Sequence, residues 1–225
     1  MKMKIKNEAE LLNKFCDKTH IKEILTEPFF NTNYNEVWSS DGVVLIRINP
    51  KALTNEYPKK KLGFPKLESP CNKKITLEAV SQALNECPKI DEEIVIKDAV
   101  ECEDCNGSGY VTWEYMDIHG HTHEHESDCP VCDGTGEIEP ERTKKTGKQI
   151  TDEDAVINIG NACFRARVIS KLKFALDFLG ITSVKLTHNP NRAANEFVLN
   201  DDIRIILMPM LSPWDDHDAV VELID

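Results

Sequence analysis

Two segments of this 225-residue chain contain no lysine or arginine. Residues 101–140 hold 11 acidic and no basic residues, and residues 211–225 hold five acidic and no basic residues. The net charge of −12 is therefore unevenly spread, because the rest of the chain carries +4 once those 16 carboxylates are set aside. An acidic surface repels phosphate groups, yet the average charge does not exclude nucleic acid as a ligand of the remaining part.

Long apolar runs are also missing. No window approaches the roughly 20 apolar residues that a membrane-spanning helix needs. The N-terminal sequence MKMKIKNEAELLNKF turns polar where a secretory signal would need an apolar stretch. The hydrophobic content of 40% and the mean hydropathy of −0.40 are typical of a soluble globular protein, which we expect to be cytoplasmic.

The sequence lacks the motifs of several common enzyme classes. It contains no GxSxG, GxxxxGK[ST], GxGxxG or HExxH. The carboxylate run Asp152, Glu153 and Asp154 lies in a turn-like segment without partner residues, and we interpret it as the cap of a helix or strand. We therefore predict a non-enzymatic protein, with a site assembled from distant residues as the remaining enzymatic alternative.

Periodicity and turn residues predict an α+β protein. The Asp41-Gly42 pair between two β-rich runs predicts a hairpin over residues 35–48. Apolar residues at helical spacing predict helices, and β-branched runs predict strands. The expected helices cover 7–18, 75–87 and 162–180, and the further strands cover 92–102, 155–160, 182–188, 195–199 and 202–210.

Two copies of a CxxCxGxG pattern stand in the acidic segment. Their cysteines are Cys102 and Cys105 in the first copy and Cys129 and Cys132 in the second. Two thiolates separated by two residues can hold one ion from a tight turn, and two such turns complete a tetrahedral site. The spacing therefore predicts one structural Zn²⁺, with a thioredoxin-like redox pair as the alternative.

The repeats resemble the zinc-binding region of DnaJ-type co-chaperones, which carries four such copies and two zinc ions. Two copies over about 35 residues imply one zinc ion and a small inserted β-hairpin module. The chain has no His-Pro-Asp sequence, which is the signature of the J-domain in that family.

Four alternating histidines lie between the two cysteine pairs, at His119, His121, His123 and His125. On one strand all four would share a face, which would suit a second metal ion or a proton-sensitive surface. The alternative is a solvated hairpin tip.

The C-terminal part from Ala155 resembles the last part of bacterial DNA sliding clamps, the β subunit of the replicative polymerase. The sequence around the Asp41-Gly42 turn, with Ser39 and Ser40, also looks like a clamp strand and turn. The C-terminal resemblance covers about 55 residues and rests on Ile159, Gly160, Leu172, Phe174, Ala175, Leu176, Leu179, Val184, Leu186, Phe197, Leu207, Met208, Pro209 and Met210.

This resemblance implies that a helix face meets DNA phosphates. Helical spacing places Arg167 and Lys173 on the polar face, with Lys171 at its edge and Arg165 turned towards the apolar stripe. These four residues are the candidate DNA contacts, and an ordinary solvated helix face is the alternative. One clamp-like domain cannot encircle DNA alone, so a ring would require a homo-oligomer. An adaptor that does not form a ring would not require self-association.

Together these patterns predict three parts. Residues 1–100 and 141–210 form a DNA-clamp-like body, residues 101–140 form the inserted zinc module, and residues 211–225 form an acidic tail. We expect a nucleic-acid-associated protein whose body contacts DNA and whose zinc arm contacts a protein partner. The alternative is a co-chaperone-like, zinc-dependent protein-binding module without DNA binding.

Overall fold

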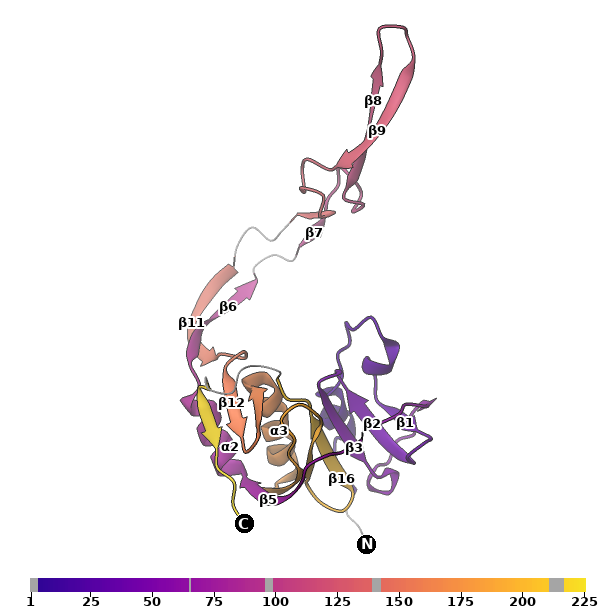
Figure 1. The fold of residues 1–225 in the computed structure, drawn as a ribbon. Helices are drawn as coiled ribbons and strands as arrows, with labels where there is room; N and C mark the ends of the chain where they lie inside the picture. The colour runs from indigo at the N-terminus through magenta and orange to yellow at the C-terminus, as the bar shows by residue number, and fades with distance from the viewer. Residues whose placement is uncertain (1–3, 65, 96–98, 139–142, 211–216) are drawn as a thin grey trace. The chain divides into compact units, whose positions relative to one another are not determined.

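The computed structural model describes residues 4–64, 66–95, 99–138, 143–210 and 217–225 (Figure 1). The chain divides into two compact units. Unit 1 comprises Met1–Lys89 and Thr151–Asp225, and unit 2 comprises Ile90–Ile150. Unit 2 contains the segment 101–140 predicted as the zinc module together with the flanking strands that pair with each other, and the bounds of the module itself stay a prediction.

Unit 1 is built around an eight-stranded sheet. Its strand order is β4-β1-β2-β3-β16-β15-β14-β5, and only the β1–β4 pair is parallel. The central β3–β16 pair, with Ile46 opposite Ile205, joins the N-terminal and C-terminal strands. The strands are β1 (Phe29–Asn31), β2 (Glu36–Ser40), β3 (Val44–Ile48), β4 (Lys59–Lys60), β5 (Pro70–Thr76), β14 (Ser183–His188), β15 (Asn195–Val198) and β16 (Ile203–Leu207).

The predicted hairpin over residues 35–48 is present as β2 and β3. Gly42 has φ +94°, which a glycine adopts without the steric cost of a side chain. Asp41 Oδ1 accepts hydrogen bonds from the backbone N–H groups of Val43 and Val44 at 2.9 and 2.7 Å. The turn chemistry of the Asp-Gly pair therefore sets this connection.

A second sheet in unit 1 contains β13, β12 and β17. These are β12 (Val156–Ile159), β13 (Ala162–Arg165) and β17 (Ala219–Val221), and β17 runs parallel to β12. Ala219 and Val221 are buried, so the end of the predicted acidic tail packs into unit 1. Residues 211–216 of that tail lie outside the described residues.

Three α-helices are described, all of them in unit 1: α1 (Glu8–Asn13), α2 (Leu77–Glu86) and α3 (Ala166–Leu179). Short 3-10 turns add η1 (Glu23–Leu25) and η2 (Pro50–Ala52). The Thr76 side chain caps α2 by accepting a hydrogen bond from the N–H of Ala79, and Gly180 ends α3 with φ +65°. Helix α3 is shorter than predicted, because residues 162–165 pair with β12 as a strand.

The core of unit 1 lies between the helices and the sheets. Helix α3 buries the stripe that its sequence predicts, including Val168, Leu172 and Leu176. These residues pack with sheet residues such as Ile46, and α2 packs against α3. The α+β class predicted from the sequence is therefore confirmed. Among the described residues, no helix is long and apolar enough to cross a membrane.

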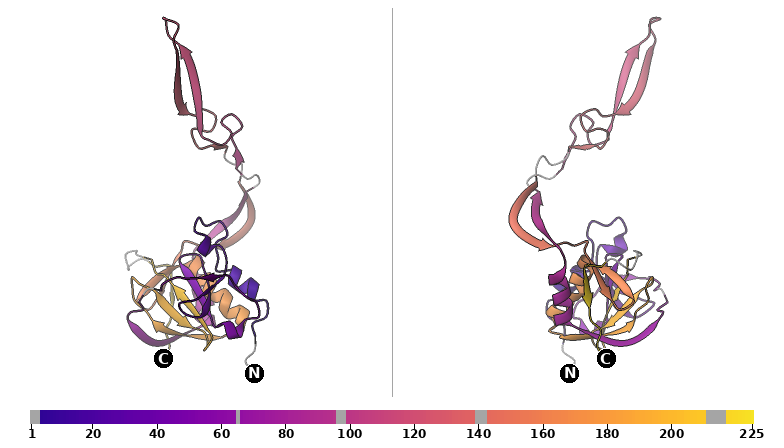
Figure 2. Two further views of the ribbon diagram at one scale, coloured as in Figure 1. Left: turned by 90° about the vertical axis from the view of Figure 1, so that its right-hand side faces the viewer. Right: turned by 60° about the vertical axis from the view of Figure 1, so that its left-hand side comes forward.

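Unit 2 consists of two-stranded ribbons. Strands β6 (Lys89–Val95) and β11 (Thr143–Thr151) pair with each other, as do β7 (Val100–Glu101) and β10 (Glu137–Ile138). Strands β8 (Tyr110–Met116) and β9 (Thr122–Asp128) form a long hairpin, which both views of Figure 2 draw in full. The strand predicted over 92–102 corresponds to the end of β6 and to β7, with residues 96–98 between them outside the described residues.

The chain leaves unit 1 and re-enters it at one place. The backbone N–H of Asp152 donates to the carbonyl oxygen of Pro88 at 2.9 Å. The ammonium group of Lys89 donates to the Thr151 hydroxyl at 2.8 Å. The two ends of the insertion are therefore hydrogen-bonded neighbours.

Candidate metal centre

The two CxxCxGxG turns bring their four cysteines into one cluster, as the sequence predicts. Cys102, Cys105, Cys129 and Cys132 are all buried, and their Sγ atoms lie within 4.8 Å of one another. Cys102 Sγ is 3.9 Å from Cys129 Sγ, and Cys105 Sγ is 3.8 Å from Cys132 Sγ. In a tetrahedral site with metal–sulfur bonds of about 2.3 Å, neighbouring sulfurs are about 3.8 Å apart. The cluster can therefore hold one metal ion.

Each turn aims a backbone N–H group at one of its own sulfurs. The N–H of Gly109 donates to Cys105 Sγ and that of Gly136 donates to Cys132 Sγ, both at 3.3 Å. Such hydrogen bonds stabilise a thiolate and orient it towards an ion. The two repeats of the sequence thus give two equivalent halves of one site.

The halves are also joined to each other through their backbones. The N–H of Cys102 donates to the Gly136 carbonyl at 2.9 Å, and the N–H of Cys129 donates to the Gly109 carbonyl at 2.7 Å. A Cβ atom on Gly109 would stand 2.4 Å from the carbonyl oxygen of Gly134, which is far inside contact distance. Only glycine permits this approach, which explains the second glycine of the first repeat.

The pKa of the thiol group differs between cysteine positions. Burial raises the pKa of Cys102 to about 11. For Cys132, burial also disfavours the thiolate, but the N–H of Gly136 and the neighbouring thiols outweigh it and lower the pKa to about 7. A metal ion requires thiolates and displaces their protons, so metal binding and proton release are coupled here.

The β8–β9 hairpin begins at this cluster, because Val111 of β8 packs against the four cysteines. Its register places Trp113 opposite His125 and Tyr115 opposite His123 on one face. The Tyr115 and His123 rings stack with centroids 5.1 Å apart and an interplanar angle of 21°. We call this side, with Trp113, Tyr115, His123 and His125, the aromatic face.

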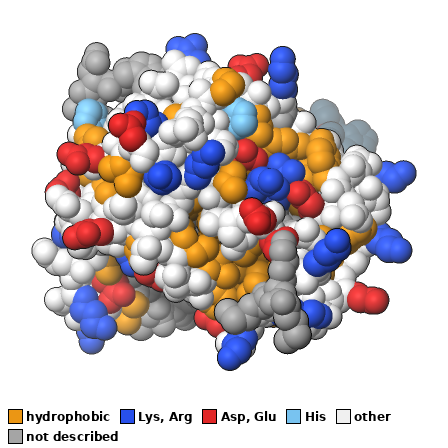
Figure 3. All heavy atoms as spheres, turned by 90° about the horizontal axis from the view of Figure 1, so that it is seen from below, with side chains coloured by type: hydrophobic (Ala, Val, Ile, Leu, Met, Phe, Trp, Pro, Cys, Tyr) orange, Lys and Arg blue, Asp and Glu red, His pale blue; other side chains and the backbone are white. Residues whose placement is uncertain are grey.

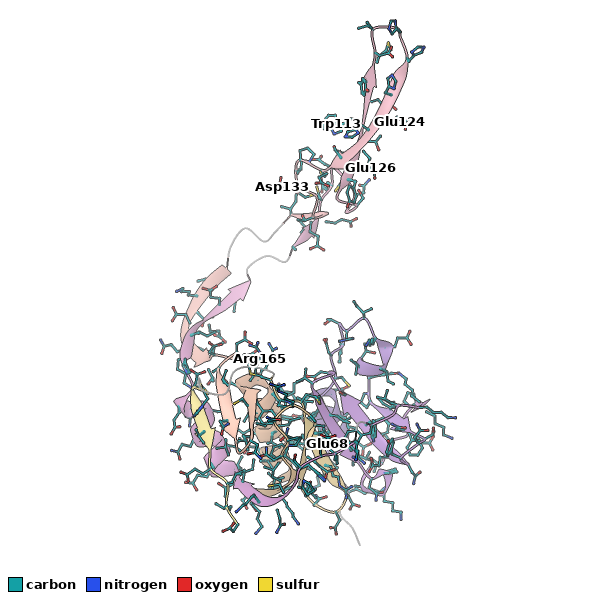
Figure 4. The ribbon with its side chains drawn as sticks, in the orientation of Figure 1. Glu68, Trp113, Glu124, Glu126, Asp133 and Arg165 are labelled. Atoms are coloured by element: carbon teal, nitrogen blue, oxygen red, sulfur yellow. The ribbon has the colours of Figure 1, made fainter. Side chains whose placement is uncertain are left out.

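The opposite side of the hairpin is acidic. Glu114 lies directly opposite Glu124, and Glu126 follows two residues later on the same face. All three side chains are exposed, and in the described part of unit 2 none of them has a hydrogen bond or ion pair. We call these three residues the acidic face; Figure 4 labels Glu124 and Glu126 on it, and Trp113 on the aromatic face.

The four predicted histidines are divided between the strand and the turn. His123 and His125 belong to β9, while His119 lies in the turn and His121 directly precedes the strand. The carboxylate of Asp117, which the sequence analysis did not single out, accepts hydrogen bonds from the backbone N–H groups of His119 and His121 and lies beside the rings of His121 and His123. Its position in the sequence, two residues before the first histidine, was the available signal.

The four candidate DNA contacts all have carboxylate partners. Arg165 and Arg167 both bind Asp154, with nitrogen–oxygen distances of 2.5 and 3.2 Å. Two guanidinium groups therefore share one carboxylate. Arg165 lies in β13, one residue before α3 begins.

The two lysines are paired individually. Lys171 binds Asp41 at 2.5 Å, and Lys173 binds Asp177 one helical turn later at 2.6 Å. On the face drawn in Figure 3, which is seen from below and does not mark these four residues, Lys and Arg side chains are interspersed with Asp and Glu rather than gathered into one patch. DNA contact by these four residues stays a prediction.

Protein-family models and curated proteins gave no match to this chain. A search of solved structures matched bacterial sliding clamps. The DNA polymerase sliding clamp from Pseudomonas aeruginosa with ligand is 11% identical, with a TM-score of 0.43, and the match covers 91% of this chain and 64% of that chain. The clamp from Bacillus subtilis is 9% identical, with a TM-score of 0.43 and coverages of 92% and 63%.

The Helicobacter pylori beta clamp bound to a DNA ligase peptide is 12% identical, with a TM-score of 0.42 and coverages of 90% and 62%. This chain thus spans less than two thirds of the length of each of these clamps. The clamp-like character of the body and the DnaJ-type character of the module stay predictions from the sequence.

Proposed function

We propose that this protein is a non-enzymatic binding protein in which a zinc-stabilised module presents an acidic hairpin to a basic protein partner. The observation that carries the proposal is the acidic face of the β8–β9 hairpin, whose three carboxylates are exposed and unpaired in the described part of unit 2. Like charges placed directly opposite each other, as at Glu114 and Glu124, destabilise an isolated hairpin. A basic partner would relieve this repulsion.

Zinc is the ion that suits the four cysteines. Four thiolates complete a tetrahedral shell around Zn²⁺ and leave no position for substrate or an activated water, so its role would be structural. Zinc bound by four thiolates carries a net charge of about −2, which would add to the negative charge of the module. The metal would thus both stabilise the base of the hairpin and strengthen its attraction for a cationic partner.

Metal content tests the zinc part of this proposal. We expect one zinc ion per natively purified chain and none in the double variant Cys102→Ser/Cys132→Ser. Cys71→Ser is the control, because Cys71 belongs to unit 1 and lies outside the cluster. Native protein without zinc would refute the metal centre.

Binding of a basic peptide tests the partner surface. We expect a fluorescent lysine- and arginine-rich peptide to bind the zinc-loaded protein, with affinity that falls as salt increases. The triple variant Glu114→Gln/Glu124→Gln/Glu126→Gln should weaken binding at least tenfold. The control Glu10→Gln/Glu23→Gln/Glu56→Gln removes as many exposed carboxylates from unit 1. Equal losses in both variants would assign the binding to net charge and refute the acidic face as the site.

DNA association through the body is a second candidate function. It is favoured by the arrangement of Arg165 and Arg167, which share the single carboxylate of Asp154 and so leave one positive charge in excess. The Arg167 side chain is 53% exposed and accessible to a phosphate group. A mobility shift at low salt should be lost in Arg167→Glu/Lys173→Glu, and an unchanged, salt-insensitive shift would refute DNA contact by this helix.

A further inference from the structure

A small cavity lies at the base of the β8–β9 hairpin, beside the cysteine cluster. Its volume is about 220 Å³. Pockets that take small-molecule ligands or cofactors usually measure about 300–1,000 Å³, so this cavity suits a single side chain. Its wall is mostly apolar and comes from two segments: Val111 and Trp113 of β8, and Pro130 and Val131 of the second cysteine turn.

The Trp113 ring in this wall is exposed but held in one orientation. Trp113 is 56% exposed, and its Nε1–H donates a hydrogen bond to Ser127 Oγ of β9 at 2.8 Å (Figure 4). A ring that is already oriented loses little side-chain entropy when a partner packs on it. Tryptophan is also enriched among the residues that contribute most to the stability of protein interfaces.

The metal centre supports the rest of the wall. Val131 lies between Cys129 and Cys132 and is 53% exposed, and Val111 packs against the four cysteines. The same turns that hold the sulfurs therefore hold the cavity open. Exposed apolar groups that surround one hollow are typical of sites that bind another polypeptide.

The charges around the cavity indicate which polypeptide fits it. Asp104 lines the cavity and is exposed, and Thr112, which also lines it, lies directly opposite Glu126 of the acidic face. Residues 101–140 contain 11 acidic and no basic residues. An apolar side chain with Lys or Arg on both sides is therefore the complement of this surface in both polarity and charge.

One partner segment can reach both the cavity and the acidic face. Trp113 and Glu114 are consecutive residues of β8, so their side chains point to opposite sides of the ribbon but are only about 3.4 Å apart along the strand. In the described part of unit 2, β8 has β9 as its one neighbouring strand, so its outer edge is open. A segment that crosses this edge passes from the cavity to the carboxylates.

We propose that this cavity, the Trp113 pocket, receives one leucine-sized aliphatic side chain of the partner, from a position flanked by basic residues. The inference rests on the proposed function, because Asp104 and the acidic face attract the flanking cations. It adds a requirement that charge alone does not impose, namely an apolar residue between the basic ones. Complete burial of a leucine side chain raises affinity more than tenfold, so partial burial in this open pocket should contribute about fivefold.

Two fluorescent peptides of equal charge test this proposal on the zinc-loaded full-length protein. Both are rich in Lys and Arg, and they differ only in a central residue, which is leucine in one and serine in the other. The leucine peptide should bind the unchanged protein about fivefold more tightly. Val131→Gln makes the wall polar and should remove this difference without weakening the serine peptide, while zinc measured on the same sample stays at one per chain.

Val100→Gln is the matched control. Val100 also belongs to unit 2 and is 43% exposed, but it lies in β7 and does not line the pocket. This variant should keep the preference for leucine. The indole N–H resonance of Trp113, assigned by its loss in Trp113→Phe, should shift with the leucine peptide and much less with the serine peptide.

The outcomes separate the pocket from the proposed function. Equal binding of the two peptides to the unchanged protein, or equal loss of the leucine preference in Val131→Gln and Val100→Gln, would overturn the pocket and leave the acidic face in place. An indole resonance of Trp113 that does not move would also overturn it. If neither peptide binds, both the proposed function and the pocket that rests on it are refuted.

Discussion

Replacing Gly109 by alanine should disrupt the metal centre through a clash between its two halves. The new Cβ would stand 2.4 Å from the carbonyl oxygen of Gly134, while ordinary contacts begin near 3.4 Å. The two turns must therefore separate by a substantial fraction of an ångström. That movement strains the backbone hydrogen bonds that join them, including the 2.7 Å bond from Cys129 to Gly109.

A second glycine with a similar backbone conformation separates the energy of this clash from the cost of placing alanine at positive φ. Gly109 has φ +78° and Gly120 has φ +84°, so the backbone conformation destabilises alanine by a similar amount, about 1–2 kcal/mol, at both positions. A Cβ on Gly120 meets no atom within 4 Å. If the clash weakens two inter-turn hydrogen bonds of about 1 kcal/mol each, Gly109→Ala should lose about 2 kcal/mol more than Gly120→Ala. This corresponds to about 30-fold weaker zinc affinity.

Competition with a chromophoric chelator measures that difference, and thermal unfolding of unit 1 shows whether the rest of the protein is intact. Gly136→Ala should behave like Gly109→Ala, because its Cβ would stand 2.3 Å from the carbonyl oxygen of Gly107. Equal zinc affinities for Gly109→Ala and Gly120→Ala would show that the close approach of the two turns does not limit metal binding.

Three further predictions concern other parts of the chain. Asp154→Ala removes the carboxylate shared by two arginines, so low-salt DNA affinity measured by mobility shift should increase, and a decrease would contradict DNA contact at this surface. Val221→Ala should destabilise unit 1 by about 1–3 kcal/mol in urea unfolding, because Val221 is 1% exposed, whereas Val220→Ala, at 45% exposed, should change stability little. The N–H of His121 and the contact with His123 lower the pKa of Asp117 to about 2 in the folded hairpin, so the contribution of this carboxylate to tip stability is complete above about pH 4 and is lost as pH falls towards 2. Nuclear magnetic resonance of the His121 and His123 amides across this range should follow that loss, and an unchanged spectrum would contradict it.

Local chemistry explains which parts of the structure follow from the sequence. The Asp41-Gly42 turn, the apolar stripe of α3 and the two cysteine turns each depend on residues close together in the chain, and all three are present. Spacing fixes such features because a turn or a helix face is decided within a few residues. The α+β class follows from them.

Features that depend on distant segments could not be predicted in this way. The parallel pairing of β17 with β12 joins residues about 60 positions apart, and nothing in the short VVELI run indicates a partner. The pairing of Lys171 with Asp41 likewise joins α3 to the first hairpin turn. A helical projection identifies the cations on a face but not the carboxylates that meet them.

The hydrogen-bonded neck between Pro88 and Asp152, with Lys89 and Thr151 beside it, has a consequence for how such a chain can change. Unit 2 leaves and re-enters unit 1 at neighbouring residues, so it connects to unit 1 as an ordinary hairpin would, through two adjacent chain segments. The closure entropy of this connection depends only weakly on how many residues it contains. We therefore expect unit 1 to keep its fold when a tight turn replaces unit 2.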